Sequence, residues 1–393
     1  MTSRFLQIHT LTTYAASLLN RDDVGAAKRL PFGGSMRTRI SSQCLKRHWR
    51  KAAGAWSLEA LGVPMTVRSR RIFPERIAAP LLAEGHAVPP VIAVVQALMD
   101  VVLQKNEKGD AAADKPSRKK VGTVTTEDAL KTLETGQVIV LGQPEIDFLL
   151  AAARAILAEG TADPKAAAMA YVKQNRANLE ALRTAAGLDG ALFGRMVTSD
   201  IFARGDAAIH VAHAFTVHAA ESEPDYFTAV DDLVQAAGET GSGLISTTEL
   251  TSGLFYGYVV IDLPKLIENL SDDASLAGQV TERLLHLIAS VSPGAKLGST
   301  APYAYAEAVL VEAGARQPRT LANAFRQALP EAASLGETAL DRLGEYLRRF
   351  DTMYGPDEDR RVAALTMPAA FPAEPMPLAP LATWAGGIVA GTP

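Results

Sequence analysis

The sequence contains a single cysteine, Cys44, among 393 residues. An intrachain disulfide is therefore excluded, and one lone thiol is typical of proteins in a reducing cytoplasm. Residues 1–5 lack the positively charged stretch followed by an apolar stretch that marks a signal peptide. We therefore expect a cytoplasmic protein.

Long apolar runs are also missing. The longest, residues 88–103, is interrupted by Pro89, Pro90, Gln96 and Asp100, so it is too short and too broken to span a bilayer. Hydrophobic residues make up 48% of the chain and charged residues 21%, a balance that excludes global disorder. The length allows two or three domains, each with its own core.

Acidic residues are absent from residues 24–58, a segment that contains eight Lys or Arg residues. The formal net charge of the whole chain is −4, which on its own argues against nucleic-acid binding. However, salt screens charges that lie more than about 8 Å apart. A local cationic surface on an acidic protein can therefore still bind phosphate.

The order of the predicted elements indicates the fold class. Residues 5–11 alternate between apolar and polar, which predicts a first strand. A basic helix and a long helical insertion follow, and residues 251–263, 280–291 and 306–311 then predict a strand, a helix and a strand. This order predicts an α/β (α+β) fold, a ferredoxin-like sheet of the RRM type interrupted by an insertion. Open sheets of this type commonly bind RNA.

A basic helix is predicted directly after Ser41 and Ser42, either of which would cap it. Leu45, His48, Trp49, Ala52 and Ala53 form its apolar stripe. Four cations fall on the opposite side, and Arg37 and Arg39 precede the helix. Helix N-termini attract phosphate, so the pattern predicts RNA binding without sequence preference. A merely solvated basic face is the alternative. The four cations are Lys46, Arg47, Arg50 and Lys51.

An adjacent aromatic pair, Tyr226-Phe227, lies in a polar segment at 219–249. Aromatic side chains in such a segment can stack on bases or wedge beside them. They can equally pin the loop to the body of the protein. The residues themselves leave both roles open.

Three histidines, His210, His213 and His218, lie on or near a helix predicted at 209–218. Their spacing matches no zinc motif, so we expect structural roles, and we expect neither a metal nor another cofactor. His9 on the first strand is a candidate general base, but no partner for it can be identified from the sequence.

Several ordered motifs resemble one known family. The first is Leu19-Asn20-Arg21-Asp22-Asp23, followed by Phe32-Gly33-Gly34 and by Arg39-Ile40-Ser41-Ser42-Gln43-Cys44-Leu45-Lys46-Arg47. Together with six later blocks, they resemble the RNA-binding backbone subunit of the type I-E CRISPR complex Cascade, in the RAMP superfamily. The later blocks are residues 194–199, 210–214, 225–232, 252–256, 293–296 and 321–325.

The resemblance implies a hand-shaped protein with an RRM-like palm, helical fingers and a protruding thumb. Copies would stack along the spacer of a CRISPR guide RNA, and each thumb would push one base out of line. The implied parts are palm at 1–57, fingers at 58–190, palm at 191–219, thumb at 220–249, palm at 250–366 and a Pro-rich C-terminal tail at 367–393.

The resemblance also implies partners and binding residues. The partners are the guide RNA, the target DNA strand paired to it, neighbouring copies, other Cascade subunits and a recruited nuclease-helicase. Tyr226 and Phe227 would displace the base, and the family more often has Trp at the position of Tyr226. The expected RNA-binding residues are Arg21, Arg37, Arg39, Ser41, Ser42, Lys46, Arg47, Arg50, Met196 and Lys296.

The resemblance favours a protein that is not an enzyme, because a separate nuclease-helicase acts on the target in type I-E systems. The alternative is a ribonuclease, since some members of the superfamily cut RNA with a thumb aspartate or a histidine. Asp225, Asp231 and Asp232 lie in the expected thumb. A third interpretation, a generic helical structural protein, leaves the acid-free segment at 24–58 unexplained.

Overall fold

The computed structural model describes residues 3–103, 125–175, 187–195, 205–230, 242–295 and 297–391. The chain forms two compact units. The sheet unit comprises Met1–Leu61, Ile209–Ile267 and Asp273–Pro393, and the helical unit comprises Gly62–Ala208 and Glu268–Asp272. The helical unit therefore continues to Ala208, beyond the predicted end of the insertion at residue 190.

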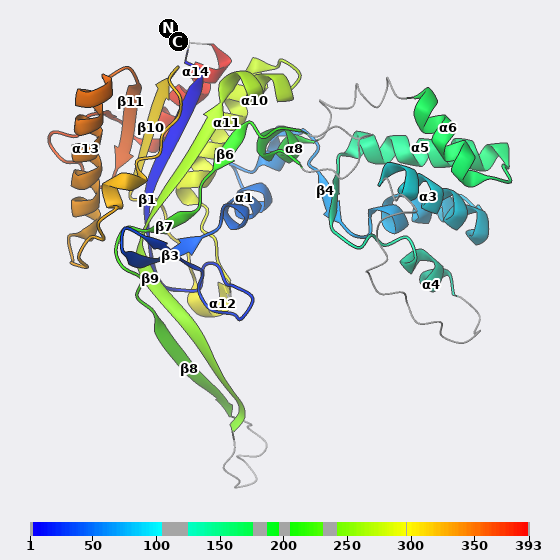
Figure 1. Ribbon diagram of the computed structural model, residues 1–393, viewed down its shortest axis with the longest axis horizontal. Helices are drawn as coiled ribbons and strands as arrows, with labels where there is room; N and C mark the ends of the chain where they lie inside the picture. The colour runs from blue at the N-terminus through cyan, green and yellow to red at the C-terminus, as the bar shows by residue number, and fades with distance from the viewer. Residues whose placement is uncertain are drawn as a thin grey trace. The chain divides into compact units, whose positions relative to one another are not determined.

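The sheet unit contains a large mixed sheet whose strands run in the order β12-β11-β10-β1-β9-β7-β3-β2, with β6 and β8 also paired to β9 (Figure 1). The predicted α/β fold class is confirmed. The strands are β1 Phe5–Ser17, β2 Arg29–Phe32, β3 Ser35–Ile40, β6 Ile209–Val211, β7 Ala214–Thr216, β8 Glu223–Val230, β9 Ser242–Asp262, β10 Ala308–Gly314, β11 Asp359–Ala364 and β12 Glu374–Pro375. The helices are α1 Ser42–Lys51, η1 Leu58–Leu61, α10 Leu263–Asn269, α11 Ala274–Ser290, α12 Leu297–Thr300, η3 Ala322–Phe325, α13 Leu335–Tyr354 and α14 Leu378–Ala390.

Strand β1 lies at the centre of this sheet. It pairs antiparallel with β9 on one side and with β10 on the other. Since both neighbours oppose β1, they run parallel to each other, and α11 lies between them in the sequence. This split βαβ unit is the core of a ferredoxin-like fold.

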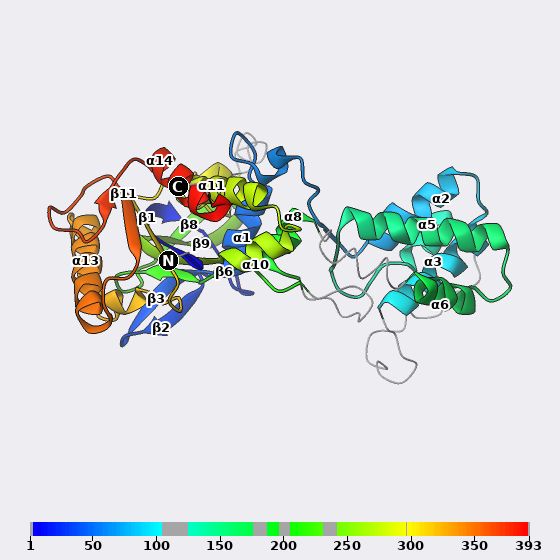
Figure 2. The ribbon, with the colours of Figure 1, turned by 90° about the horizontal axis from the view of Figure 1, so that it is seen from above.

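Helices cover both faces of the sheet. Leu340 and Leu347 of α13 belong to a core cluster that includes Leu11 and Leu310 on one face. On the opposite face, Ile8 lines a hollow together with Leu45 and Trp49 of α1 and Ile288 of α11. Helices α13 and α11 lie on opposite sides of the sheet (Figure 2). The open sheet face on which RRM domains commonly bind RNA is therefore covered at these strands.

The face under α13 buries an ionic network. The Glu312 carboxylate is inaccessible to solvent and accepts from Arg319 at 2.6 and 2.7 Å, from Arg360 at 2.7 Å and from His9 Nε2 at 3.0 Å. His9 Nδ1 lies 2.9 Å from the Tyr256 hydroxyl. Burial raises the pKa of Glu312, but the hydrogen bonds from Arg319 and His9 outweigh it and hold that pKa well below its usual range. Burial lowers the pKa of His9.

Two predictions from the sequence are wrong. Residues 209–218 do not form a helix, because Ile209–Val211 and Ala214–Thr216 pair with β9 as β6 and β7. The C-terminal tail, which its six prolines predict to be extended or loosely docked, instead ends in helix α14. Except for Pro393, which lies outside the described residues, its prolines precede the helix or lie in its first turn, where no backbone N–H is needed for a helical bond.

Helix α14 packs closely against α11. A Cβ atom built on Gly386 would come within 2.9 Å of the Gly278 carbonyl oxygen, and one built on Gly278 within 2.8 Å of the Gly386 carbonyl oxygen. The two glycines thus allow the helix backbones to approach at this point. The Pro-rich segment is therefore an integral part of the sheet unit.

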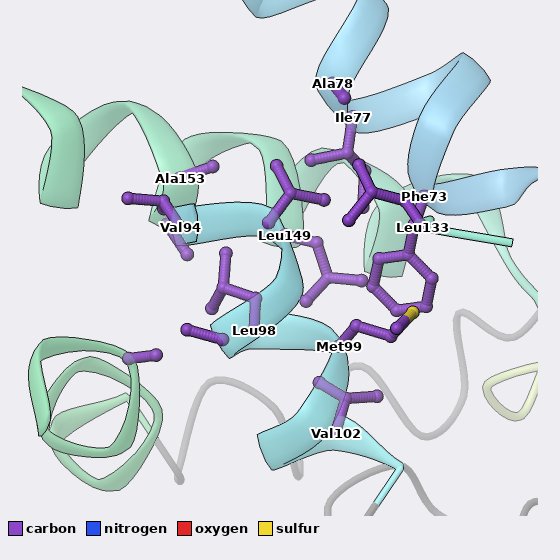
Figure 3. Packing of buried hydrophobic residues seen from close by; sticks show 14 of the residues in the cluster. Phe73, Ile77, Ala78, Val94, Leu98, Met99, Val102, Leu133, Leu149 and Ala153 are labelled. Carbon is purple, nitrogen blue, oxygen red and sulfur yellow. The ribbon is translucent and has the colours of Figure 1, made fainter. Parts of the chain in front are cut away.

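The helical unit has its own hydrophobic core, in which Phe73, Leu98, Met99 and Leu149 pack together (Figure 3). None of the described helices combines the length and apolar composition that a bilayer span requires. The elements are β4 Val67–Ser69, η2 Phe73–Ala78, α2 Ala79–Ala83, α3 Val88–Val102, α4 Thr126–Lys131, β5 Ile139–Leu141, α5 Gln143–Glu159, α6 Pro164–Gln174 and α8 Leu188–Phe193.

The ionic network under α13 generates a stability prediction. Replacing Glu312 with Gln leaves two buried guanidinium groups without their carboxylate, and breaking a buried ion pair in this way costs about 3–5 kcal/mol. We expect the free energy of unfolding in urea to fall by about that amount. Glu345→Gln is the matched control, because Glu345 pairs with Arg349 on the surface and such changes stay within about 0.5 kcal/mol. Similar losses in the two variants would contradict the prediction.

Candidate nucleic-acid interface

A hollow of about 690 Å3 lies at one end of the sheet, beside the N-terminal half of α1. The connection from β1 to β2, helix α1 and the Gly294-Ala295 loop form its walls. Arg21 and Arg47 line it and are exposed, and two acidic residues, Asp22 and Asp23, line it as well. The Asp22 carboxylate already accepts from backbone amides. We call this hollow the cationic groove. It brings together three of the predicted RNA-binding residues, Arg21, Ser41 and Arg47.

The connection between β1 and β2 is held by its own polar side chains. Asp22 Oδ1 accepts from the backbone amides of Val24 at 3.1 Å and Ala26 at 2.8 Å. Asn20 Oδ1 accepts from the amide of Ser41 at 2.9 Å, which ties the connection to the start of α1. Asn20 and Asp22 therefore position Arg21 beside α1, a structural role that the sequence did not reveal.

Helix α1 forms where it was predicted. Ser41 caps it, accepting from the amide of Cys44 at 3.3 Å. Trp49 is buried, and Leu45 packs against the core beneath the helix. No acidic residue occupies its first turn. The apolar stripe thus fixes which side of α1 faces the sheet and leaves Arg47 exposed, whereas Lys46 and Arg50 are half-buried.

His213 contacts the N-terminus of α1. Its Nδ1 accepts from the Ser42 amide at 3.2 Å and lies 3.3 Å from Arg39 Nη1. Burial and the neighbouring charge of Arg39 lower the pKa of His213, which favours the neutral imidazole. Protein groups therefore already satisfy the amides of Ser42 and Cys44. This arrangement favours phosphate binding by side chains over binding at the helix N-terminus.

Arg37 does not belong to the interface. It was expected to bind RNA, but its side chain is inaccessible to solvent, and its guanidinium donates to five backbone carbonyls at 3.0–3.4 Å. It holds the β2–β3 hairpin against the sheet. The acceptors are the carbonyl oxygens of Phe32, Thr216, His218, Phe325 and Arg326.

The other expected residues are buried at the helix cap, half-buried, or outside the described residues. Ser41 is buried as the cap of α1, and Ser42 is half-buried beside it. Arg39 is half-buried and donates from Nε to the Arg29 carbonyl at 3.3 Å. Met196 and Lys296 lie outside the described residues.

A two-stranded ribbon carries the predicted aromatic pair. Beyond the part of β9 that pairs with β1, residues 242–250 pair with β8 (Figure 1). Tyr226 pairs with Thr247 and Phe227 with Ser246, so the two aromatic side chains point to opposite faces of the ribbon. Their exposed fractions are 62% and 37%.

Among the residues that the structure describes, the candidate catalytic groups do not lie together. Asp225 is exposed on β8, and Asp231 and Asp232 lie outside the described residues. His9 has partners, Glu312 and Tyr256, but it is 1% exposed and has no access to substrate. Among the described residues, no group of three His, Cys, Asp or Glu side chains is placed to hold a metal ion.

Comparisons with known proteins connect this geometry to a family. The model of the family described as CT1975-like protein matches residues 6–380. A chain of a solved structure titled "CRISPR RNA-guided surveillance complex, pre-nicking" is similar with a TM-score of 0.75 and 28% identity, covering 98% of this chain and 99% of that chain. A second, titled "CRISPR RNA-guided surveillance complex", gives a TM-score of 0.69 and 25% identity, covering 99% and 100%. No curated protein matches.

The groove generates a prediction about salt dependence. Arg21→Ala and Arg47→Ala should each weaken binding of single-stranded RNA and reduce the slope of log affinity against log salt by about 0.7, the value for one phosphate that is no longer neutralised. Arg342→Ala is the control. This exposed arginine lies on α13, which covers the face of the sheet opposite to α1. RNA affinities of the wild type and the three variants, measured across a salt series, check this prediction. Unchanged slopes in both groove variants would exclude the phosphate assignment.

Proposed function

The chain belongs to the CT1975-like protein family, and from this membership we propose that it is a non-catalytic RNA-binding subunit of the type I-E CRISPR surveillance complex Cascade. The observation that carries the proposal is the similarity along almost the whole chain to structures titled CRISPR RNA-guided surveillance complex. In this proposal the protein acts in the cytoplasm, and several copies form the backbone of the complex along a guide RNA.

The groove supports a contact with the RNA backbone. Arg21 and Arg47 are exposed cations on an otherwise acidic chain, and guanidinium groups match phosphate oxygens well. Binding through phosphates gives affinity without sequence preference. A guide RNA needs a protein that binds it without sequence preference, because base pairing with the target DNA supplies the specificity.

The ribbon supports a contact with bases. Tyr226 is largely exposed on a hairpin that continues past the body of the sheet. In the proposed assembly, the ribbon of one copy reaches over the RNA held by its neighbour and displaces one base. The remaining bases stay available to the target strand, and other Cascade subunits and a recruited nuclease-helicase complete the complex.

The non-catalytic part of the proposal rests on the burial of His9, the candidate general base. RNA cleavage requires a general base and acid within hydrogen-bond reach of the substrate. His9 is closed off by Tyr256, Glu312 and the helices above the sheet. The alternative, cleavage by a ribbon aspartate, would use Asp225, which is exposed.

Purification provides the direct test. We expect the protein expressed with its complex to carry one discrete population of guide-length RNA, and to leave added complementary RNA intact in the presence of divalent metal. Sequencing gels of the extracted and of the added RNA measure both. Preparations without bound RNA would reject the proposal. Cleavage abolished by Asp225→Asn would instead establish the ribonuclease alternative.

The aromatic pair provides a test of the ribbon. Replacing Tyr226 and Phe227 together with Ala should change the melting temperature of the free subunit little, because exposed substitutions typically change stability within about 0.5 kcal/mol. Target-DNA binding by the reconstituted complex should weaken by about 1–3 kcal/mol for each base that no longer stacks on a ring. Tyr354→Ala, another exposed tyrosine, is the control. A much lower melting temperature with normal target binding would show that the pair anchors the hairpin instead.

A further inference from the structure

Two tyrosines outside the ribbon are exposed more than either ribbon aromatic. Tyr303 is 75% exposed and Tyr305 is 76% exposed, in the segment between α12 and β10. Neither residue belongs to the cationic groove. Large aromatic side chains displayed to solvent in this way are typical of binding surfaces.

The segment that carries them is anchored. Between the tyrosines, Ala304 packs against a core cluster. The Ala304 amide donates to Ser292 Oγ at 2.8 Å, and the same hydroxyl donates to the Ala304 carbonyl at 2.8 Å. With the alanine turned inward, the residues on either side point outward. The two rings are therefore held on the surface by a fixed backbone.

The start of the segment is a tight turn. The Tyr303 amide donates to the Ala301 carbonyl at 2.7 Å, and Ala301 has a φ of 37°, which L-residues other than glycine rarely adopt. Such conformations persist only where the surrounding structure enforces them, and they cluster at functional sites.

The segment is continuous with the cationic groove. Pro302 packs on Gly294, where a Cβ atom would come within 2.4 Å of the proline ring. Gly294 and Ala295 line the groove, and the Ala295 amide donates to the Leu18 carbonyl at 2.9 Å. The residue next to Tyr303 thus contacts a groove wall, which places the aromatic pair beside the proposed path of the phosphates.

We propose that Tyr303 and Tyr305 form a stacking platform for bases of the single-stranded RNA whose phosphates lie in the cationic groove. The inference rests on the proposed function and adds a base contact to it. Because every base has a π-face, such a platform holds RNA without reading its sequence.

A protein segment is the competing occupant. Tyr305 also lines an apolar hollow of about 610 Å3 with Leu365, Met367 and Met376. The direct contact of Pro302 with the groove wall favours RNA. The test therefore includes an outcome for a protein partner.

The experiment compares two RNA probes of equal length: a single-stranded oligonucleotide and its abasic analogue, which keeps the phosphates and lacks the bases. The full chain is measured as wild type, as Tyr303→Ala with Tyr305→Ala, as Tyr303→Phe with Tyr305→Phe, and as the control Tyr354→Ala. Affinities are taken across a salt series, and melting temperatures verify folding.

For the Ala double variant, we expect affinity for the normal oligonucleotide to fall about 5- to 150-fold for each base that no longer stacks on a tyrosine ring, with an unchanged salt slope. Its affinity for the abasic probe should equal that of wild type. The Phe variant and Tyr354→Ala should bind as wild type does.

Other results would overturn the platform. Full RNA affinity in the Ala variant would reject it, and if association between copies disappeared at the same time, the pair would be a protein-docking site. Failure of the wild-type protein to bind either probe would reject the proposed function itself. Weaker binding with a reduced salt slope would show that the tyrosines act only by positioning the arginines.

Discussion

The buried carboxylate of Glu312 is the constraint on which the sheet unit depends. It lies on β10 and receives hydrogen bonds from β1 through His9, from β11 through Arg360 and from the following loop through Arg319. Arg360 extends the network to Asp351 on α13 at 2.5 and 2.6 Å. A charge removed from water is tolerated only when its partners are in place. The Glu312 network thereby fixes both the register of β1, β10 and β11 and the position of α13 on the sheet.

Closing this face of the sheet determines where RNA can bind. RRM proteins stack bases on aromatic residues of an open sheet face. Here the corresponding polar positions, Gln7 and His9, are buried under α13 and the loop that carries Arg319. The connection after β1, helix α1 and the Gly294-Ala295 loop instead form a polar groove at the end of the sheet. Hydrogen bonds within the connection position Arg21 there, and the buried stripe of α1 leaves Arg47 exposed beside it.

Local patterns predicted local structure well. The alternation along β1 and the stripe of α1, with Trp49 buried and Ser41 as the cap, could be predicted from neighbouring residues. What could not be predicted depends on partners far away in the chain: His9 and Glu312 are 303 positions apart. Arg37 illustrates the same limit, because a cation inside a basic segment looks like a phosphate ligand until its five carbonyl acceptors are known. The prolines before α14 were misinterpreted because proline also starts helices.

The proposed function separates two physical tasks in this molecule. The groove provides charge, which attracts any strand and weakens with salt. Aromatic rings on the ribbon and on the 303–305 segment provide surfaces that are insensitive to salt and to base identity. Because Tyr226 and Phe227 face opposite sides of the ribbon, one ring can contact a base while the other faces away from it. A protein that must hold RNA firmly and still leave most bases exposed benefits from this separation, since the phosphates are fixed at one place and only selected bases are engaged at another.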